Sequence, residues 1–287
     1  MQTYTVPAGV TSITIDAYGA QGGANGGLGA EISGDFIVTP GEVLTIIVGE
    51  EGLLQQGGNY QNSAGGGGGS FVYNNIPTLL AAAGGGGGLC PYTGAVPLHA
   101  DGHGQASTDG GWNSDYTSQG GVGGNGGTEG IWSGNPCSGG GAGWLGDGGS
   151  IYGGSGIMNS WTGGSPYCNG GGGGCGGYGG YGGGGGAGNL YGGGGGGGGY
   201  SGGAGGNDPD HGGGGGSYNS GTNQNNISGV QTGNGLVIIS YSSQTCTGCT
   251  DPTALNYDSL ALFDNGSCCY ISGCTNPIAN NYDPVAC

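Results

Sequence analysis

Oxygen-bearing side chains recur at short intervals near the end of the sequence, where they could bind a metal ion. They are Asp251, Asn256, Asp258, Asp264 and Asn265. Carboxylate and amide oxygens are the ligands that Ca²⁺ prefers, although the spacing differs from the EF-hand pattern. The same residue types also favour Asx turns. The sequence therefore indicates either a calcium site or a set of turns.

A second set of possible ligands is His99, Asp101 and His103, which occupy alternate positions. Alternate side chains share a face in an extended segment, and imidazole together with carboxylate suits Zn²⁺ or Cu²⁺. Glycine flanks the segment and its composition is polar, which favours the alternative of a simple loop.

Acidic and aromatic side chains interrupt the glycine blocks between residues 170 and 216. Asp208 and Asp210 lie in an acidic loop that could attract a cation or a basic ligand, or could simply be solvated. The aromatic residues are Tyr178, Tyr181, Tyr191, Tyr200 and Tyr218, joined by Trp112, Trp132, Trp144 and Trp161. Tyr and Trp are over-represented at interfaces. These side chains therefore either cover the glycine segments or anchor a partner.

The charge composition excludes several classes of function. The chain has no Lys or Arg, and its formal net charge is −17. Binding to nucleic acid or to an anionic membrane surface needs cationic side chains. Neither a Ser-His-Asp order nor a nucleotide-binding loop is recognisable. We therefore expect no catalytic residues and no enzyme, and we expect partners that are cationic or neutral.

Ten cysteines indicate an oxidising, extracellular environment. No apolar run approaches the roughly 20 residues of a membrane helix, and no signal peptide is visible at Met1. Export would then need a longer precursor or another route, such as a virion. Four cysteines (Cys90, Cys137, Cys168 and Cys175) allow three pairings. The Cys168–Cys175 loop is the shortest and is the first expectation.

Solid glycine blocks dominate residues 170–216, and earlier blocks lie at 65–69 and 84–88. A flexible linker is one interpretation. Collagen is excluded, because it needs glycine at every third position together with abundant proline. We favour polyglycine II, in which extended helices with three residues per turn bond to their neighbours. Such a bundle would satisfy its buried backbone groups without conventional secondary structure.

Strand patterns occupy much of the sequence from 3 to 90 and reappear at 236–241. Residues 12–18 alternate, with Ile13, Ile15 and Ala17 on one face. Further strands are predicted at 3–6, 31–38, 43–48, 70–73 and 76–82, the last two as a hairpin. The late strand has no local partner, so it must return to the first sheet. We therefore expect a β-sandwich domain at 1–243, with the glycine-rich insertion at about 84–235.

Several phrases carry a resemblance to a receptor family, in the same order along both chains. They include TVPAGVTSITIDAYGAQGG, IIVGEEG, GGGGGSFVY, LLAAAGGGGG, NDPDHGG and GNGLVIISY. They resemble the extracellular glycine-rich domain of the anaplastic lymphoma kinase and leukocyte tyrosine kinase receptors. The resemblance implies a tumour-necrosis-factor-like jelly-roll sandwich with an inserted polyglycine II bundle, and a basic ligand. It does not extend to a kinase or a membrane helix. Glycine-rich bundles also resemble the tips of some phage tail-fibre adhesins.

Residues 244–287 contain two Cys-bounded repeats in which Cys249 and Cys274 are equivalent, and the second copy is truncated. They resemble modules of secreted Bacteroidetes proteins, and we expect the natural chain to continue with more of them. So short a unit needs disulfides. Cys249 should pair with Cys268, and Cys246 with Cys269.

Our first functional expectation is an extracellular structural or adhesive protein that associates with itself in a surface filament. The alternative is a binding module, such as an adhesin, that recognises a protein or glycan partner. Ice binding by a flat polyglycine face is a third possibility.

Overall fold

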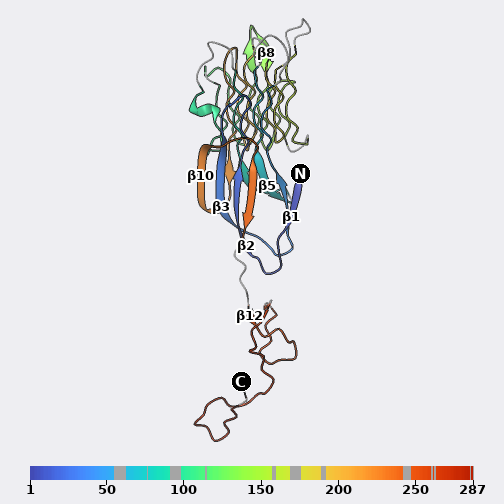
Figure 1. Ribbon diagram of the computed structural model, residues 1–287, viewed down its shortest axis with the longest axis vertical. Coiled ribbons are helices and arrows are strands. Elements are labelled where there is room, and N and C mark those ends of the chain that lie inside the picture. Colours follow the sequence, from blue (N-terminus) through green and yellow to red (C-terminus); the bar gives the residue numbers. More distant parts are fainter. Residues whose placement is uncertain are drawn as a thin grey trace.

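A computed structural model describes the chain apart from residues 55–62, 76, 91–97, 114, 157–159, 169–175, 189–191, 242–246, 260, 262, 285 and 287. The fold is mainly β, and the helical element of the described part is a single 3₁₀ turn, η1 (Ala100–Gly102). Figure 1 shows the glycine-rich region at one end, two sheets in the middle and the C-terminal repeats at the other end. No helix in the described ranges is long and apolar enough to cross a membrane.

Two antiparallel sheets form the middle of the molecule. The five-stranded sheet has, in order, β1 (Gln2–Thr5), β4 (Val43–Ile47), β5 (Ser70–Asn74), β6 (Leu79–Ala83) and β9 (Tyr218–Asn219). The four-stranded sheet has, in order, β10 (Thr222–Gln231), β3 (Gly29–Ile37), β2 (Ser12–Tyr18) and β11 (Leu236–Ser240). The strands predicted at 3–6, 12–18, 31–38 and 43–48 are thus confirmed, with small shifts at some of their ends.

The hydrophobic core lies between the two sheets. From β2 and β3 it takes alternate side chains, including Ile13, Ile15 and Ile32, which are almost fully buried. Leu44 and Val72 face them from the five-stranded sheet. Alternation places every second side chain on one face of a strand, so the sequence pattern of β2 decides which of its residues enter the core.

The late strand, β11, joins the sheet of the early strands, as expected. β11 pairs antiparallel with β2, and Val237 lies opposite Ala17. The predicted hairpin is also present, because β5 pairs with β6. Its second arm begins at Leu79 rather than at residue 76, which lies outside the described residues. Segments that are far apart in the sequence therefore share one sheet.

β9 and β10 lie within the stretch that the sequence assigned to the glycine-rich insertion. β10 is rich in Asn and Gln, which have low strand propensity, so no local pattern predicted it. Long-range pairing with β3 sets its position, with Asn225 opposite Ser33. The side chain of Asn219 adds a hydrogen bond from Nδ2 to the carbonyl oxygen of Ser33, at 2.8 Å. Tertiary contacts here override propensity.

A second, aromatic cluster covers the other face of the five-stranded sheet. Phe71 follows the sheet's pleat away from Val72 and packs against Trp161, with ring centroids 4.1 Å apart. Trp144 lies 6.1 Å from the same ring. Both tryptophans come from the glycine-rich region and are buried. This cluster joins the glycine-rich region to the sheet.

Buried serines complete the junction. The hydroxyl of Ser70, at the start of β5, accepts a hydrogen bond from the Gly49 N–H at 3.0 Å and donates one to the Tyr18 carbonyl at 2.6 Å. Ser217 likewise accepts from the Gly84 N–H and donates to the Gln105 carbonyl. Each hydroxyl forms hydrogen bonds with backbone groups at the boundary between the sheets and the glycine-rich region, where the backbone hydrogen-bond pattern of the sheets ends.

The segment at 192–200 shows how the glycine blocks bind one another. Its backbone N–H groups donate to other segments at 2.8–3.1 Å, and the partner segment recurs at every third residue. Gly194, Gly197 and Tyr200 donate to Asp210, Gly213 and Gly216; Gly195 and Gly198 donate to Ala64 and Gly67; Gly196 and Gly199 donate to Gly139 and Ala142. The acceptors advance along their own segments in the same steps.

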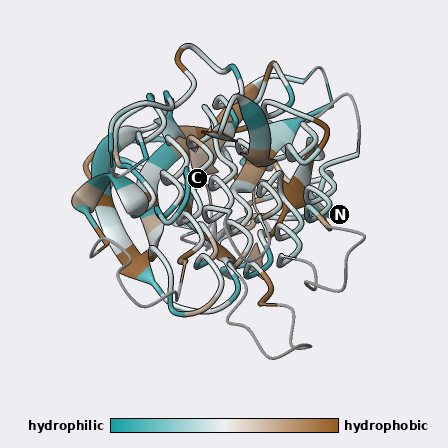
Figure 2. Cartoon of the chain, turned by 90° about the horizontal axis from the view of Figure 1, so that it is seen from above, coloured by the Kyte–Doolittle hydropathy of each residue, from teal (hydrophilic) through white to brown (hydrophobic). Residues whose placement is uncertain are grey.

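The carbonyl groups of the same segment bind three further segments. The donors are backbone N–H groups: those of Gly206 and Gly203 in the first segment, of Gly88 and Gly85 in the second, and of Gly185 in the third. The 192–199 segment is therefore buried among six hydrogen-bonded neighbours. In the view from above in Figure 2, the glycine segments are seen end on as closely spaced pale coils, with more strongly coloured segments around them.

Glycine is required here because side chains do not fit. A Cβ atom built on Gly195 would overlap the carbonyl group of Gly185, and one on Gly194 would overlap that of Gly88. The close approach of backbones thus depends on the missing side chains.

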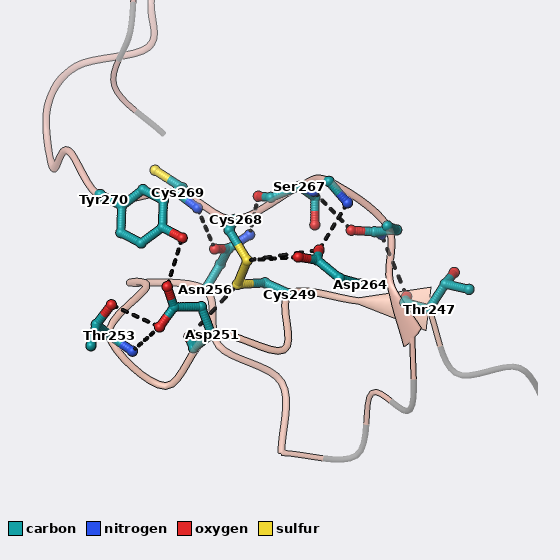
Figure 3. The surroundings of a disulfide bond; sticks show 12 residues. Thr247, Cys249, Asp251, Thr253, Asn256, Asp264, Ser267, Cys268, Cys269 and Tyr270 are labelled. Carbon is teal, nitrogen blue, oxygen red and sulfur yellow. Dashed lines mark hydrogen bonds between the residues drawn. A yellow bond between two sulfur atoms is a disulfide. The ribbon is translucent and has the colours of Figure 1, made fainter.

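The two C-terminal repeats have the same local structure. The Asp258 N–H donates to the Cys249 carbonyl, and at the equivalent place in the second repeat the Asp283 N–H donates to the Cys274 carbonyl. The short strands β12 (Thr247–Gly248) and β13 (Phe263–Asp264) pair in the first repeat. The predicted disulfide between Cys249 and Cys268 is present, with a Cα–Cα distance of 4.7 Å (Figure 3). Cys269 is also disulfide-bonded, but its expected partner Cys246 lies outside the described residues.

Candidate functional site

A pocket of about 450 Å³ is lined in part by β8 (Asn135–Ser138). β8 lies at the end of the glycine-rich region that is farthest from the two sheets (Figure 1). We call this cavity the distal pocket. Its lining residues are Trp132, Asn135, Pro136, Cys137, Ser150, Ile151, Tyr152 and Tyr167. Among the described residues, the lining contains no charged side chain and is largely apolar. Its volume is within the roughly 300–1,000 Å³ of small-molecule sites.

A tight hairpin carries one wall of the distal pocket. β7 (Gly130–Trp132) pairs with β8 through a two-residue turn, so that Trp132 lies opposite Asn135. Ser133 and Gly134 have φ angles of 50° and 81°. Positive φ at both turn residues is typical of a type I′ hairpin. Trp132 directly precedes this turn and is half exposed.

Two tyrosines also line the pocket. The rings of Tyr152 and Tyr167 have centroids 5.4 Å apart and planes at 77°, an edge-to-face pair. The glycine-rich region positions Tyr167, because its N–H donates to the Ala187 carbonyl. Burial, with the neighbouring Tyr167 as a smaller cause, raises the pKa of Tyr152. The Tyr152 phenol is therefore neutral at physiological pH.

Cys137 lines the pocket as a buried free thiol. Burial raises its pKa, and the negative charge of Asp208 adds to that effect. Because only the thiolate is a strong nucleophile, Cys137 is an inert thiol near neutral pH.

Asn207 ties the hairpin to the acidic loop. Its Oδ1 accepts a hydrogen bond from the Ile131 N–H at 2.7 Å, and its Nδ2 donates to Asp115 Oδ2 at 2.9 Å. Burial disfavours the charge of Asp115, but hydrogen bonds from Thr117 and Asn207 outweigh it and lower the pKa. The acidic loop thus supports the hairpin that carries the pocket.

The loop differs from the solvated loop that the sequence allowed. Asp210 is buried, and its carbonyl accepts the Gly194 N–H. Burial raises the pKa of Asp208. Tyr200, in contrast, packs with Tyr181 in the aromatic cluster against the sheet. The structure thus separates these acidic and aromatic residues instead of joining them in one site. Tyr178 is half exposed, and Tyr191 lies outside the described residues.

The segment of His99, Asp101 and His103 is not extended, because η1 turns it into a 3₁₀ turn. The two histidines have different contacts: His103 Nδ1 accepts the Leu28 N–H at 2.9 Å, whereas the His99 ring packs beside Tyr116 and His211. Among the described residues, no group of three or more His, Cys, Asp or Glu side chains is arranged to hold a metal ion. The common face expected of an extended segment is therefore absent.

The candidate calcium ligands of the repeats are engaged in turns (Figure 3). Asp251 Oδ1 accepts the Thr253 N–H at 2.8 Å, and its Oδ2 accepts the Tyr270 hydroxyl at 2.8 Å. Asn256 accepts the Cys269 N–H, Asp264 the Gly266 N–H and Asn265 the Ser267 N–H. These contacts fit the Asx-turn alternative. Asp258 also has a partner within the protein.

Of the cysteines in the glycine-rich region, Cys90 and Cys137 are buried free thiols, whereas Cys168 is disulfide-bonded. Its expected partner Cys175 lies outside the described residues, so that pairing stays a prediction.

No known family model matches this chain, and no curated protein matches it.

Sequence reasoning missed most of the distal pocket. It singled out Trp132 among the aromatics but not Ile151, Tyr152 or Tyr167. The Ser133-Gly134 dipeptide is a turn signal that could have predicted the hairpin. Nothing local links residues 150–152 to 167, because backbone hydrogen bonds between glycine segments bring them together.

Proposed function

We propose that this protein is an extracellular adhesive protein whose rigid glycine-rich region presents the distal pocket to a partner. The observation that carries this proposal is the position of the pocket. Trp132, Tyr152 and Tyr167 line a cavity together with residues of β8. β8 lies at the opposite end of the molecule from the C-terminal repeats (Figure 1). A hydrogen-bonded scaffold that fixes aromatic side chains in advance lowers the entropic cost of binding.

We further propose that the glycine segments are polyglycine II helices and that the two sheets are a tumour-necrosis-factor-like jelly roll. Hydrogen-bond partners that recur at every third residue of the 192–200 segment support the first point. Three residues per turn without internal bonds is the geometry of that helix class. The resemblance to the glycine-rich receptor domains supports both points, including the domain division near residue 243.

An extracellular location is supported by the Cys249–Cys268 disulfide and by the composition. Disulfides persist in oxidising compartments. The absence of Lys and Arg from the sequence leaves trypsin no cleavage site, which suits an exposed protein. We propose a binding role rather than an enzymatic one, supported by the raised pKa of Cys137 in the distal pocket.

Self-association into a filament is the second candidate function. One specific observation favours it: the outer face of the four-stranded sheet exposes apolar side chains. Ile227, Leu236 and Ile238 are each at least 40% exposed. A net charge of −17 opposes contact between copies. Divalent cations such as Ca²⁺ would reduce that repulsion, and this remains the role that we propose for calcium.

Attachment of beads that carry the full chain to cells and to defined protein and glycan surfaces tests the adhesive role. The Trp132→Ala variant should lose attachment, whereas Trp112→Ala, at an exposed tryptophan outside the pocket, should keep it. Equal attachment by the two variants would refute the role of the pocket.

Sedimentation and negative-stain electron microscopy, with and without Ca²⁺, test the filament candidate, which predicts polymers in the absence of any partner.

A further inference from the structure

Three aromatic side chains line the distal pocket. Tyr152 and Tyr167 form an edge-to-face pair, with planes at 77° and ring centroids 5.4 Å apart. Trp132 lines the same cavity from the hairpin. The faces of aromatic rings carry negative electrostatic potential, and Trp and Tyr attract cations. Three such side chains in one lining favour a cation over a neutral group of the same shape.

The charge of the whole protein favours the same sign of ligand. The sequence has 17 acidic residues and no Lys or Arg. No Lys or Arg side chain therefore competes for the aromatic rings, and none is present to hold an anionic ligand. The negative charge of Asp208 also helps to raise the pKa of Cys137, which lines the pocket. A cation entering the pocket would thus gain from both the rings and the surrounding field.

The lining also limits the kind of cation. Its described residues include no carboxylate and only Asn135 and Ser150 as polar side chains besides the tyrosine hydroxyls and the thiol. The Ser150 hydroxyl already accepts the Tyr152 N–H, so Asn135 Oδ1 and the tyrosine hydroxyls are the other side-chain oxygen acceptors of the described lining, and all are uncharged. A primary ammonium or a metal ion would lose water there without a carboxylate to compensate its charge. A quaternary ammonium has no N–H groups to satisfy and presents apolar surface to Ile151 and Pro136.

We propose that the distal pocket binds a quaternary ammonium group of the choline type. This inference rests on the proposed binding function of the same pocket and names its ligand class. The cation lies between Trp132 and the Tyr152–Tyr167 pair. A phosphate attached to the ligand weakens binding, because it brings negative charge to a protein of net charge −17. Free choline should therefore bind more tightly than phosphocholine.

Isothermal titration of the full chain with choline tests the proposal, with the uncharged carbon analogue 3,3-dimethylbutan-1-ol as the matched ligand. We expect choline to bind at least about tenfold more tightly than the analogue, the ratio that a cation–π energy of this class produces. Phosphocholine should bind more weakly than choline, and salt should weaken choline binding. Equal affinities for choline and its neutral analogue would overturn the proposal, as would saturable binding of glucose without binding of choline.

Single substitutions test whether choline binds at the distal pocket. Tyr152→Leu should lose about tenfold in affinity for choline, whereas Tyr152→Phe, which keeps the ring, should retain it. Trp132→Leu should also lose affinity, and Trp112→Leu should not. Circular dichroism checks that each variant is folded, and Trp132, being half exposed, is the substitution least able to disturb folding. Loss of affinity in Trp112→Leu but not in Trp132→Leu would place the site elsewhere and overturn the proposal.

The two proposals fail in distinguishable ways. If choline does not bind but Trp132→Ala still abolishes attachment to surfaces, the adhesive role stands and the ligand class is wrong. If choline binds in the pocket but no surface retains the protein, the ammonium site stands and the adhesive role is wrong.

Discussion

The Nε2 atom of His211 accepts a hydrogen bond from the backbone N–H of His99 at 3.0 Å. The other ring nitrogen lies 3.0 Å from the Gly212 carbonyl, so the neutral ring carries its proton on Nδ1. His211 is buried, and the His99 ring lies 5.7 Å from it. All three histidines of the chain take part in this region, because His103 also accepts a backbone N–H.

This arrangement predicts that acid destabilises the protein. Burial lowers the pKa of His211 and of His103 below the ordinary value for histidine, although the Gly212 carbonyl and Asp101 partly oppose the shift at His211. A lowered folded pKa means that the unfolded chain binds protons first as the pH falls. Stability is therefore fully present above about pH 6.5 and is lost as the pH falls from there through the folded pKa values.

Melting temperatures measured from pH 8 to pH 5 check this prediction. His211→Gln should show a smaller decrease on acidification than the unmodified chain. His99→Gln is the control, because it keeps the backbone N–H that His211 accepts and removes only the smaller effect of the His99 charge on the pKa of His211. If all three proteins lose stability in parallel, His211 does not cause the acid sensitivity.

The tight contacts of the 192–199 segment predict that even one methyl group is harmful there. Gly195→Ala would force a Cβ atom into the Gly185 carbonyl. We expect a loss of about 1–3 kcal/mol in the free energy of unfolding, as for other overpacked sites. Gly146→Ala is the matched control, because its Cβ would meet no atom closer than 3.6 Å. Denaturant titration measures the free energy of unfolding of both variants. Equal values would contradict close packing of the glycine segments.

The Cys249–Cys268 disulfide closes a loop with a sequence separation of 19. Its removal should destabilise the first repeat by about 3 kcal/mol on the chain-entropy estimate. Cys249→Ser with Cys268→Ser should therefore make the repeat sensitive to chymotrypsin, with Tyr257 and Phe263 as exposed targets.

The control for that experiment is Cys274→Ser, at the equivalent position of the second repeat, where the thiol is free. It should leave the cleavage pattern unchanged. The melting temperature of the two-sheet core should be the same in all three proteins, and a large decrease in the double variant would show that the repeat is not an independent unit.

The contact between Phe71 and Trp161 predicts a large loss of stability when the tryptophan is truncated. Trp161 is 1% exposed, and its Nε1 atom has no hydrogen-bond partner among the described residues, so packing is its main contribution. Trp161→Ala should cost about 3–5 kcal/mol. Trp112→Ala, at a partly exposed site, should cost much less. Thermal unfolding measures both, and similar losses would refute the role of the cluster as the junction.

Alternation by itself determined the strands of the core. Ile13 and Ile15 recur at the period of a strand, and the orphan segment at 236–240 could only pair with an early strand. Sequence repetition likewise predicted the Cys249–Cys268 disulfide, because each repeat is too short to fold on apolar burial alone. These features depend on local periodicity or on identical spacing, and both can be read along the chain.

Tertiary structure decided the rest. Glycine blocks carry no side chains, so nothing in their sequence indicates which blocks are neighbours. The neighbours of Gly195 are defined only by long-range backbone hydrogen bonds with Ala64 and Gly88. β10 is polar and forms only because β3 offers it backbone partners. The distal pocket joins Trp132, Tyr152 and Tyr167 through backbone bonds between distant segments. Long-range hydrogen bonding, which has no local signature, therefore builds the site.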